Sequence, residues 1–213
     1  GRGSECPVMN SEKGIARIIW KFADDKLAEN ISYIDGAECA NAVPDKSSFK
    51  IIKGSALDNA LKELCGGAPT ADVFKTAPLA EYIVSAGNAF SDYEITNGEC
   101  VTVTANGTAE HASTPEKGDN ALWKTLGALA ALNKVIGSQY LEKISEYLCT
   151  PLASSKLGIY VNDPKSGDLS MCLSQARMVN GELELLIDFR LPLGVTAEFV
   201  AEHLEKATGC KAQ

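Results

Sequence analysis

The residues with the clearest chemical potential lie in one loop, which spans residues 107–121 and contains His111. His111 is one of only two histidines in the chain, and a histidine can exchange or donate a proton near neutral pH. The loop is rich in Gly, Ser, Thr and Pro and connects a predicted strand to a predicted helix. Such loops often carry functional side chains, although many of them only connect. His111 is therefore the first candidate catalytic residue.

Two further polar residues could bind a small ligand. Arg190 lies near the end of a predicted strand, and its planar guanidinium can bind a carboxylate through two hydrogen bonds. The plain alternative is an ion pair with Asp188 or Glu184 on the same face of that strand. Asn41 precedes a Val-Pro pair, where it could form a turn or contact a substrate. Both are candidate substrate-binding residues.

Several other kinds of site lack support in the sequence. There is no CxxC pair and no HxxxH or HxD spacing, so we expect no metal site built from this chain alone. There is also no P-loop, no GxGxxG and no GxSxG nucleophile motif. The seven cysteines are odd in number and irregularly spaced, which favours reduced thiols in a cytoplasmic protein. A cysteine nucleophile assisted by His111 is left open.

The overall composition indicates a globular protein. Hydrophobic residues make up 45% of the 213 residues and charged residues 23%, which allows one large domain or two small ones. The formal net charge of −8 argues against a nucleic-acid surface and against a polybasic membrane contact. No apolar run is long enough for a transmembrane helix.

The hydrophobic periodicity predicts an α+β fold, with two antiparallel sheets and helices packed on one face. From Cys100 onward the predicted order is strand, helix, helix, strand, strand, helix. This order describes a ferredoxin-like split βαβ unit, whose last strand would begin at residues 211–213. Asn-Gly pairs at residues 97–98 and 180–181 predict two tight hairpins. The predicted strands are 15–22, 28–34, 48–53, 93–96, 100–106, 169–179 and 182–191, and the predicted helices follow Ser55, span 120–136, 138–149 and 196–207, and could also span 78–84.

Four segments, in the same order along the chain, resemble one family. Residues 107–121 (GTAEHASTPEKGDNA) resemble the histidine loop of the aminoacylase/carnosinase family of two-zinc peptidases. Residues 36–45 (GAECANAVPD) are similar to an Asn-x-Val-Pro stretch of its bacterial Xaa-His dipeptidase branch, and residues 186–192 (LIDFRLP) to its Ile-Asp-x-Arg-x-Pro strand. Residues 7–14 resemble the junction between the catalytic domain and an inserted lid domain.

This resemblance implies that residues 13–213 form a lid domain, with a first half at about 13–98 and a second half at about 99–213. Residues 1–12 are interpreted as a cloning remnant followed by the junction segment. The catalytic domain, with two zinc ions and a Glu general base, is expected to be absent from this sequence. The fragment alone is then expected to bind no zinc and to be inactive.

The resemblance also implies roles and partners. His111 would stabilise the oxyanion of the tetrahedral intermediate, Arg190 would hold the free carboxylate of the substrate, and Asn41 would assist substrate binding. The expected partners are a dipeptide substrate and the protein's own catalytic domain, with no nucleic acid and no membrane. The parent enzyme would be a cytoplasmic zinc dipeptidase.

Three positions depart from the family pattern. Gly3 stands where an acidic zinc ligand is expected, which suggests that the catalytic portion has been replaced. Glu110 stands where a small residue is usual, and Cys39 where an arginine is common. These two differences put fine details of substrate contact in question.

Two other functions remain open at this point. The chain could be a stand-alone α+β binding or dimerisation module without catalysis. It could also be a thiol-dependent enzyme, which would need a cysteine with a depressed pKa.

Overall fold

The computed structural model describes residues 13–209, and its strands form two main antiparallel sheets. The three-stranded sheet has the order β1 (Gly14–Ala23), β11 (Glu182–Leu191), β10 (Ser170–Val179). The four-stranded sheet has the order β2 (Ile31–Ile34), β4 (Lys46–Ile51), β6 (Val101–Asn106), β5 (Tyr93–Asn97). Two short ribbons pair β3 (Ala42–Val43) with β7 (Glu110–His111), and β8 (Asn162–Asp163) with β9 (Gly167–Asp168).

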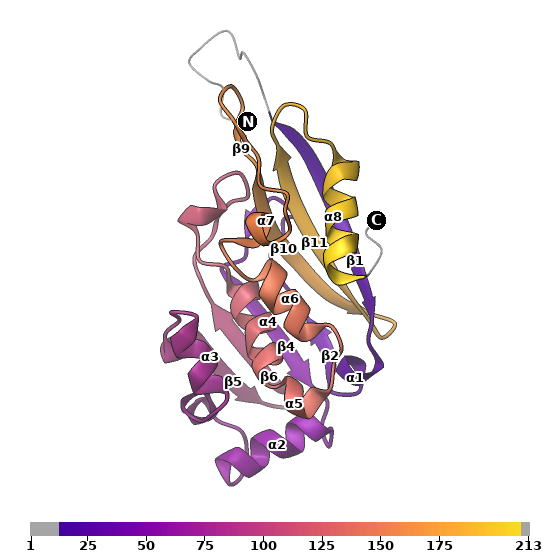
Figure 1. The fold of residues 1–213 in the computed structure, drawn as a ribbon. Coiled ribbons are helices and arrows are strands. Elements are labelled where there is room, and N and C mark those ends of the chain that lie inside the picture. Colours follow the sequence, from indigo (N-terminus) through magenta and orange to yellow (C-terminus); the bar gives the residue numbers. More distant parts are fainter. Residues whose placement is uncertain (1–12, 210–213) are drawn as a thin grey trace.

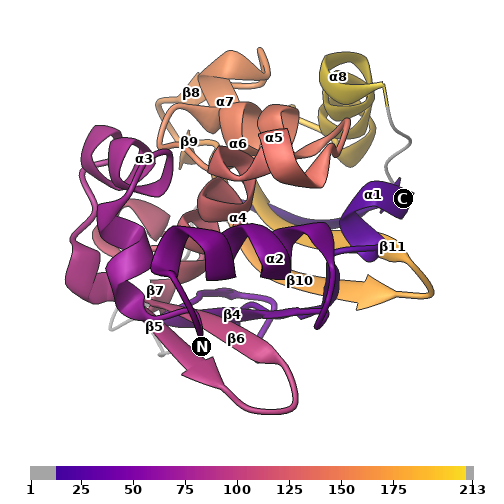
Figure 2. The same cartoon turned by 90° about the horizontal axis from the view of Figure 1, so that it is seen from below.

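The helices pack on one face of the sheets (Figures 1 and 2). We call the opposite face of the sheets the outer face. This arrangement confirms the predicted α+β class. The helices are α1 (Asp25–Ala28), α2 (Ala56–Cys65), α3 (Leu79–Ser85), α4 (Ala121–Ala131), α5 (Asn133–Ile136), α6 (Leu141–Leu148), α7 (Ala153–Lys156) and α8 (Ala197–Thr208), with 3₁₀ turns at Ala71–Lys75, Phe90–Asp92 and Pro115–Lys117.

One hydrophobic core joins both sheets to the helices. Alternate residues of β1 and β11 point into it, including Trp20, Phe22 and Phe189, none of which is more than 1% exposed. Helix α4 contributes Leu122 and Leu126, as its periodicity predicts. Each such side chain stabilises the fold by about 1.5–3 kcal/mol through removal of apolar surface from water. The core therefore fixes the position of both sheets and of the residues on their outer face.

The hairpin of β10 and β11 confirms the prediction from its Asn-Gly pair. Val179 pairs with Glu182, which leaves a two-residue turn. Asn180 and Gly181 both have positive φ, at 52° and 83°, as the type I′ turn requires.

The hairpin predicted at the other Asn-Gly pair is confirmed by the pairing of β5 with β6, but the tight Asn-Gly turn is wrong. Asn97 belongs to β5 and pairs with Val101, so the connection is the three residues 98–100. The side chain of Asn97 donates a hydrogen bond to the carbonyl of Pro69 at 2.8 Å. This contact with a distant segment holds Asn97 in the strand conformation. It therefore outweighs the local preference of an Asn-Gly pair for a turn.

Several predicted boundaries also need correction. The predicted strand 28–34 begins only at Ile31, because Asp24 caps the short helix α1 by accepting a hydrogen bond from the Leu27 amide. The predicted helix 120–136 is interrupted at Leu132, and the helix predicted to begin at Ser138 begins at Leu141. The turn-prone stretch before Pro44 contains β3, whose partner β7 lies far along the chain.

The two halves of the sequence share the sheets. Strand β1, from the first half, pairs with β11, and β6, from the second half, lies between β4 and β5. The proposed division near residue 98 thus does not separate the two sheets. The junction segment, Gly3 and the final strand expected at 211–213 lie outside the described residues. None of the helices in residues 13–209 combines the length and hydrophobicity that crossing a membrane requires.

Candidate functional site

The β3–β7 ribbon carries His111 and adjoins Asn41. Ala42 pairs with His111, and the Ala112 amide donates to the Asn41 carbonyl at 2.9 Å. The ribbon packs on the outer face of β10 through a small buried cluster, separate from the main core, of Val43, Ala112 and Cys172. Pairing and packing together therefore bring two distant segments onto one surface.

The base of the histidine loop is closed by backbone contacts. Thr108 and Asp119 exchange two hydrogen bonds, at 2.8 and 3.0 Å. A Cβ at Gly107 would lie 2.0 Å from the Asp119 carbonyl oxygen, so only glycine fits there. Asn120 then caps α4 by accepting hydrogen bonds from the next amides at 3.0 and 3.2 Å.

Lys124, on α4, anchors the end of the same loop. Its Nζ donates to Asp119 at 2.6 Å, to Asp92 at 2.8 Å and to the Asn106 carbonyl at 2.9 Å, and its side chain is only 4% exposed. Burial alone lowers the pKa of Lys124, but the hydrogen bonds that its ammonium donates to Asp119 and Asp92 outweigh the burial and leave the pKa raised. The charged lysine therefore joins the end of the loop to β6 and the 3₁₀ turn before β5.

The ring of His111 is oriented by Ser113. The Ser113 amide donates to Nδ1 at 3.2 Å, and the Ser113 hydroxyl lies 2.7 Å from the same nitrogen. Because an amide N–H can only donate, Nδ1 must accept, and the neutral ring carries its proton on Nε2. His111 is exposed, so this Nε2–H is available to a ligand.

The side chain of Asn41 lies beside that proton, with Nδ2 3.4 Å from Nε2 of His111. Two donors face each other in this orientation, and a half-turn of the amide places the Asn41 oxygen against the Nε2–H instead. Asn41 can thus restrain the ring until a ligand oxygen takes its place.

Glu110 supports the turn that holds His111. Its carboxylate accepts hydrogen bonds from the His111 amide at 2.8 Å and from the Thr114 hydroxyl at 3.3 Å. The backbone hydrogen bond is the main reason that the pKa of Glu110 is lowered. The departure from the family pattern at this position is therefore accommodated within the loop.

Arg190 is held by Asp188 on the outer face of β11. Its Nε donates to Oδ1 of Asp188 at 2.7 Å and its Nη2 to Oδ2 at 3.5 Å. The Arg190 side chain is 12% exposed and that of Asp188 is 0% exposed. Within the described part of the chain no acceptor contacts Nη1, which leaves that group for a ligand. The alternative pairing with Asp188 is thus confirmed, whereas Glu184 binds Lys21 and Arg177.

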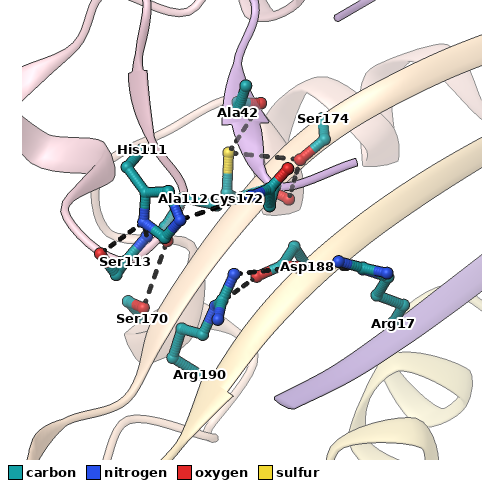
Figure 3. Close-up of polar contacts among 11 residues, drawn as sticks. Arg17, Ala42, His111, Ala112, Ser113, Ser170, Cys172, Ser174, Asp188 and Arg190 are labelled. Carbon is teal, nitrogen blue, oxygen red and sulfur yellow. Dashed lines mark hydrogen bonds and ion pairs between the residues drawn. The ribbon is translucent and has the colours of Figure 1, made fainter. Parts of the chain in front are cut away.

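The structure brings the three predicted site residues to one surface. His111 and Arg190 lie on the same side of the three-stranded sheet (Figure 3). Asn41 is joined to His111 through the contact described above. A groove of about 650 Å³ is lined in part by Ser113 and Ser170, but none of the three predicted site residues lines it. His111 and Arg190 thus each present a hydrogen-bond donor on this surface.

The sequence reasoning named Asp188 as a possible partner of Arg190 but did not identify Arg17 or Cys172 as part of this surface. In the three-stranded sheet, Asp188 on β11 lies opposite Arg17 on β1 and opposite Cys172 on β10. Directly opposed residues point to the same face of a sheet, so all three side chains lie on the outer face. Arg17 donates to Oδ2 of Asp188 at 3.3 Å. No local signal marks Arg17, because its contact spans almost the whole chain.

Neither a metal site nor a reactive thiol at Cys172 finds support in the described residues. Residues 13–209 contain no cluster of three or more His, Cys, Asp or Glu side chains that could hold a metal ion. Burial raises the pKa of the Cys172 thiol to about 11, which disfavours a thiolate beside His111. The second histidine, His203, packs against the Phe199 ring on α8, with Nδ1 2.8 Å from the Phe199 carbonyl oxygen.

Comparison with known proteins supports the family suggested by the motifs. Residues 97–209 match the family model of the M20 peptidase dimerisation domain. The search of curated proteins gave no significant match. The matched segment contains the histidine loop, α4, α6, the β10–β11 hairpin and α8, and it spans just over half of the 213 residues. The chain therefore belongs to the peptidase dimerisation domain family of the M20 peptidases.

Proposed function

We propose that this chain is the lid domain of a zinc-dependent dipeptidase of the Xaa-His dipeptidase branch. The observation that carries the proposal is the shared surface of His111 and Arg190, two donors that are oriented by separate partners. A dipeptide has a carbonyl that becomes an oxyanion during hydrolysis, and a free carboxylate a few atoms away. The two donors match these two groups.

His111 would stabilise the oxyanion. Its Nε2–H is fixed by the contact of Nδ1 with the Ser113 amide, so the donor is in place before the substrate binds. A preorganised donor of this kind lowers the barrier by about 3–4 kcal/mol in comparable sites. Asn41 would release the ring and bind the substrate as the oxyanion forms.

Arg190 would hold the carboxylate of the substrate. Its Nε is committed to Asp188, so the guanidinium cannot rotate freely and presents Nη1 in a defined direction. A fixed carboxylate anchor aligns a short peptide and selects substrates with a free C-terminus next to the scissile bond.

The zinc ions would be bound by a catalytic domain outside residues 13–209, since the described residues offer no suitable cluster. When bound, such ions would activate water and polarise the peptide carbonyl. The lid would supply the oxyanion donor and the carboxylate anchor, and it would exclude water from the closed site.

The test uses the complete parent enzyme, obtained from the coding sequence that surrounds this segment. We expect chelator-sensitive hydrolysis of dipeptides, a large fall in kcat for His111→Ala and a rise in KM for Arg190→Ala. His203→Ala is the matched control, because this histidine packs against Phe199 on α8. Absence of dipeptidase activity, or normal kinetics for both site variants, would refute the proposal.

A second function, self-association, is favoured by the match to a dimerisation domain. In that case Arg190 and His111 would serve small-acid binding or an interface. Light scattering of the parent protein separates the two: a stable dimer without any peptidase activity favours the second function.

A further inference from the structure

The charges around Asp188 add up to a net positive site. Asp188 accepts hydrogen bonds from two guanidinium groups, Nε of Arg190 at 2.7 Å and Nε of Arg17 at 3.3 Å. Its side chain is 0% exposed, whereas that of Arg17 on the neighbouring strand β1 is 50% exposed. Two cations and one anion leave one positive charge (Figure 3).

Without Arg17 the same site would be neutral. The pair of Arg190 and Asp188 alone carries no net charge, and a buried aspartate next to the anchor would repel the carboxylate of a substrate. At a few ångströms such a repulsion is large wherever solvent is partly excluded. A cation on the far side of Asp188 offsets it without occupying the position where the substrate carboxylate would bind.

We propose that Arg17 is a specificity-determining residue that acts through Asp188, by neutralising it so that Arg190 can attract a substrate carboxylate. Arg17 itself does not contact the substrate in this arrangement, and it is a positioning residue. The inference rests on the proposed function of Arg190. It adds β1, at the start of the chain, to the elements that select a substrate with a free carboxylate.

The experiment compares a dipeptide with its C-terminal amide in the complete parent enzyme. For Arg17→Met we expect KM for the free acid to rise about five- to tenfold, with kcat and the kinetics for the amide nearly unchanged. Arg17→Lys keeps the charge and should restore most of the preference for the free acid. Lys21→Met is the matched control, since Lys21 lies on the same face of β1 but pairs with Glu184.

Arg190→Ala separates the possible failures. If it leaves the preference for the free acid intact, the proposed role of Arg190 is wrong and the inference falls with it. If Arg190→Ala abolishes the preference but Arg17→Met does not reduce it, only the role of Arg17 is refuted. If Arg17→Met misfolds, Arg17→Gln and Arg17→Lys give the same comparison when they are measured at high and low salt. A preference of Arg17→Gln for the free acid that equals that of wild type overturns the inference.

Discussion

Two clusters of charge lie on the outer face of the three-stranded sheet, and both place a carboxylate between two cations. The Asp188 cluster contains Arg17 and Arg190, and the Glu184 cluster contains Lys21 and Arg177. Their chemistry is similar, but their surroundings differ. The Arg190 side chain is 12% exposed, whereas that of Arg177 is 64% exposed.

The difference comes from what covers each cluster. The β3–β7 ribbon packs on Cys172, the register partner of Asp188, and brings His111 to that end of the sheet. In the Glu184 cluster the carboxylate is 8% exposed but its two cations are 40% and 64% exposed, so water screens its ion pairs. The comparison teaches that an ordinary ion pair on the face of a sheet becomes a candidate binding site when its access to water is limited.

The strongest test of this comparison removes the imidazole of His111, a hydrogen-bond donor that the Asp188 cluster has nearby and the Glu184 cluster lacks. We expect His111→Ala to lower kcat of the parent enzyme about 10²–10³-fold with little change in KM, because an oxyanion donor acts mainly in the transition state. Steady-state kinetics measure this effect. A fall of less than threefold would remove His111 from the reaction.

The next test replaces one arginine of each cluster with alanine, Arg190 in the Asp188 cluster and Arg177 in the Glu184 cluster. Arg190→Ala should raise KM for a dipeptide about 10–100-fold, the loss expected for charge-assisted hydrogen bonds, whereas Arg177→Ala should change it less than about twofold. Kinetics of both variants with the same substrate provide the measurement. Equal effects would mean that the cover over Asp188 has no functional consequence.

A third test compares the two carboxylates in folding. Asp188→Ala leaves the mostly buried Arg190 without its partner and should cost about 3 kcal/mol of the free energy of unfolding. Glu184→Ala removes a carboxylate whose partners are 40% and 64% exposed and should cost about 1 kcal/mol. Urea unfolding of the 213-residue chain measures both values. The reverse order would contradict the comparison.

The smallest expected effect concerns pH. The pKa of Glu184 is lowered, chiefly by the hydrogen bond from Lys21, against burial and with help from Arg177. Its stabilisation is therefore present above the unfolded pKa of about 4.3 and is lost as the pH falls through the lower folded pKa. The difference in unfolding free energy between wild type and Glu184→Gln should be about 1 kcal/mol at neutral pH and should shrink near pH 3. A difference that grows on acidification would refute this account.

Local signals predicted the framework of the molecule well. The hairpin around Asn180 follows from backbone preferences that act within a few residues, as does the end of the last helix at Gly209, whose φ is 77°. The same kind of signal failed at Asn97, where the side chain contacts Pro69. Boundaries went wrong where tertiary contacts compete with local preference.

The site was predicted in part. The motifs picked out His111, Arg190 and Asn41, and the structure places them on one surface, although their roles remain predictions. The pairing of Arg190 with Asp188 on the same strand was foreseen as an alternative, but the contact of Arg17 with Asp188 was not, because local sequence patterns do not show which strands will be neighbours. The pairing of β1 with β11 decides that contact.

The sequence by itself determined the α+β class, the apolar faces of the strands and helices, and the loop that carries His111, because periodicity and turn chemistry act over short distances. Only the tertiary structure decided which strands are neighbours, that Asn41 lies beside the ring of His111, and that Asp188 is buried between two arginines. These features depend on contacts between residues far apart in the chain, and hydrogen bonds and burial fix them only after the sheets have formed.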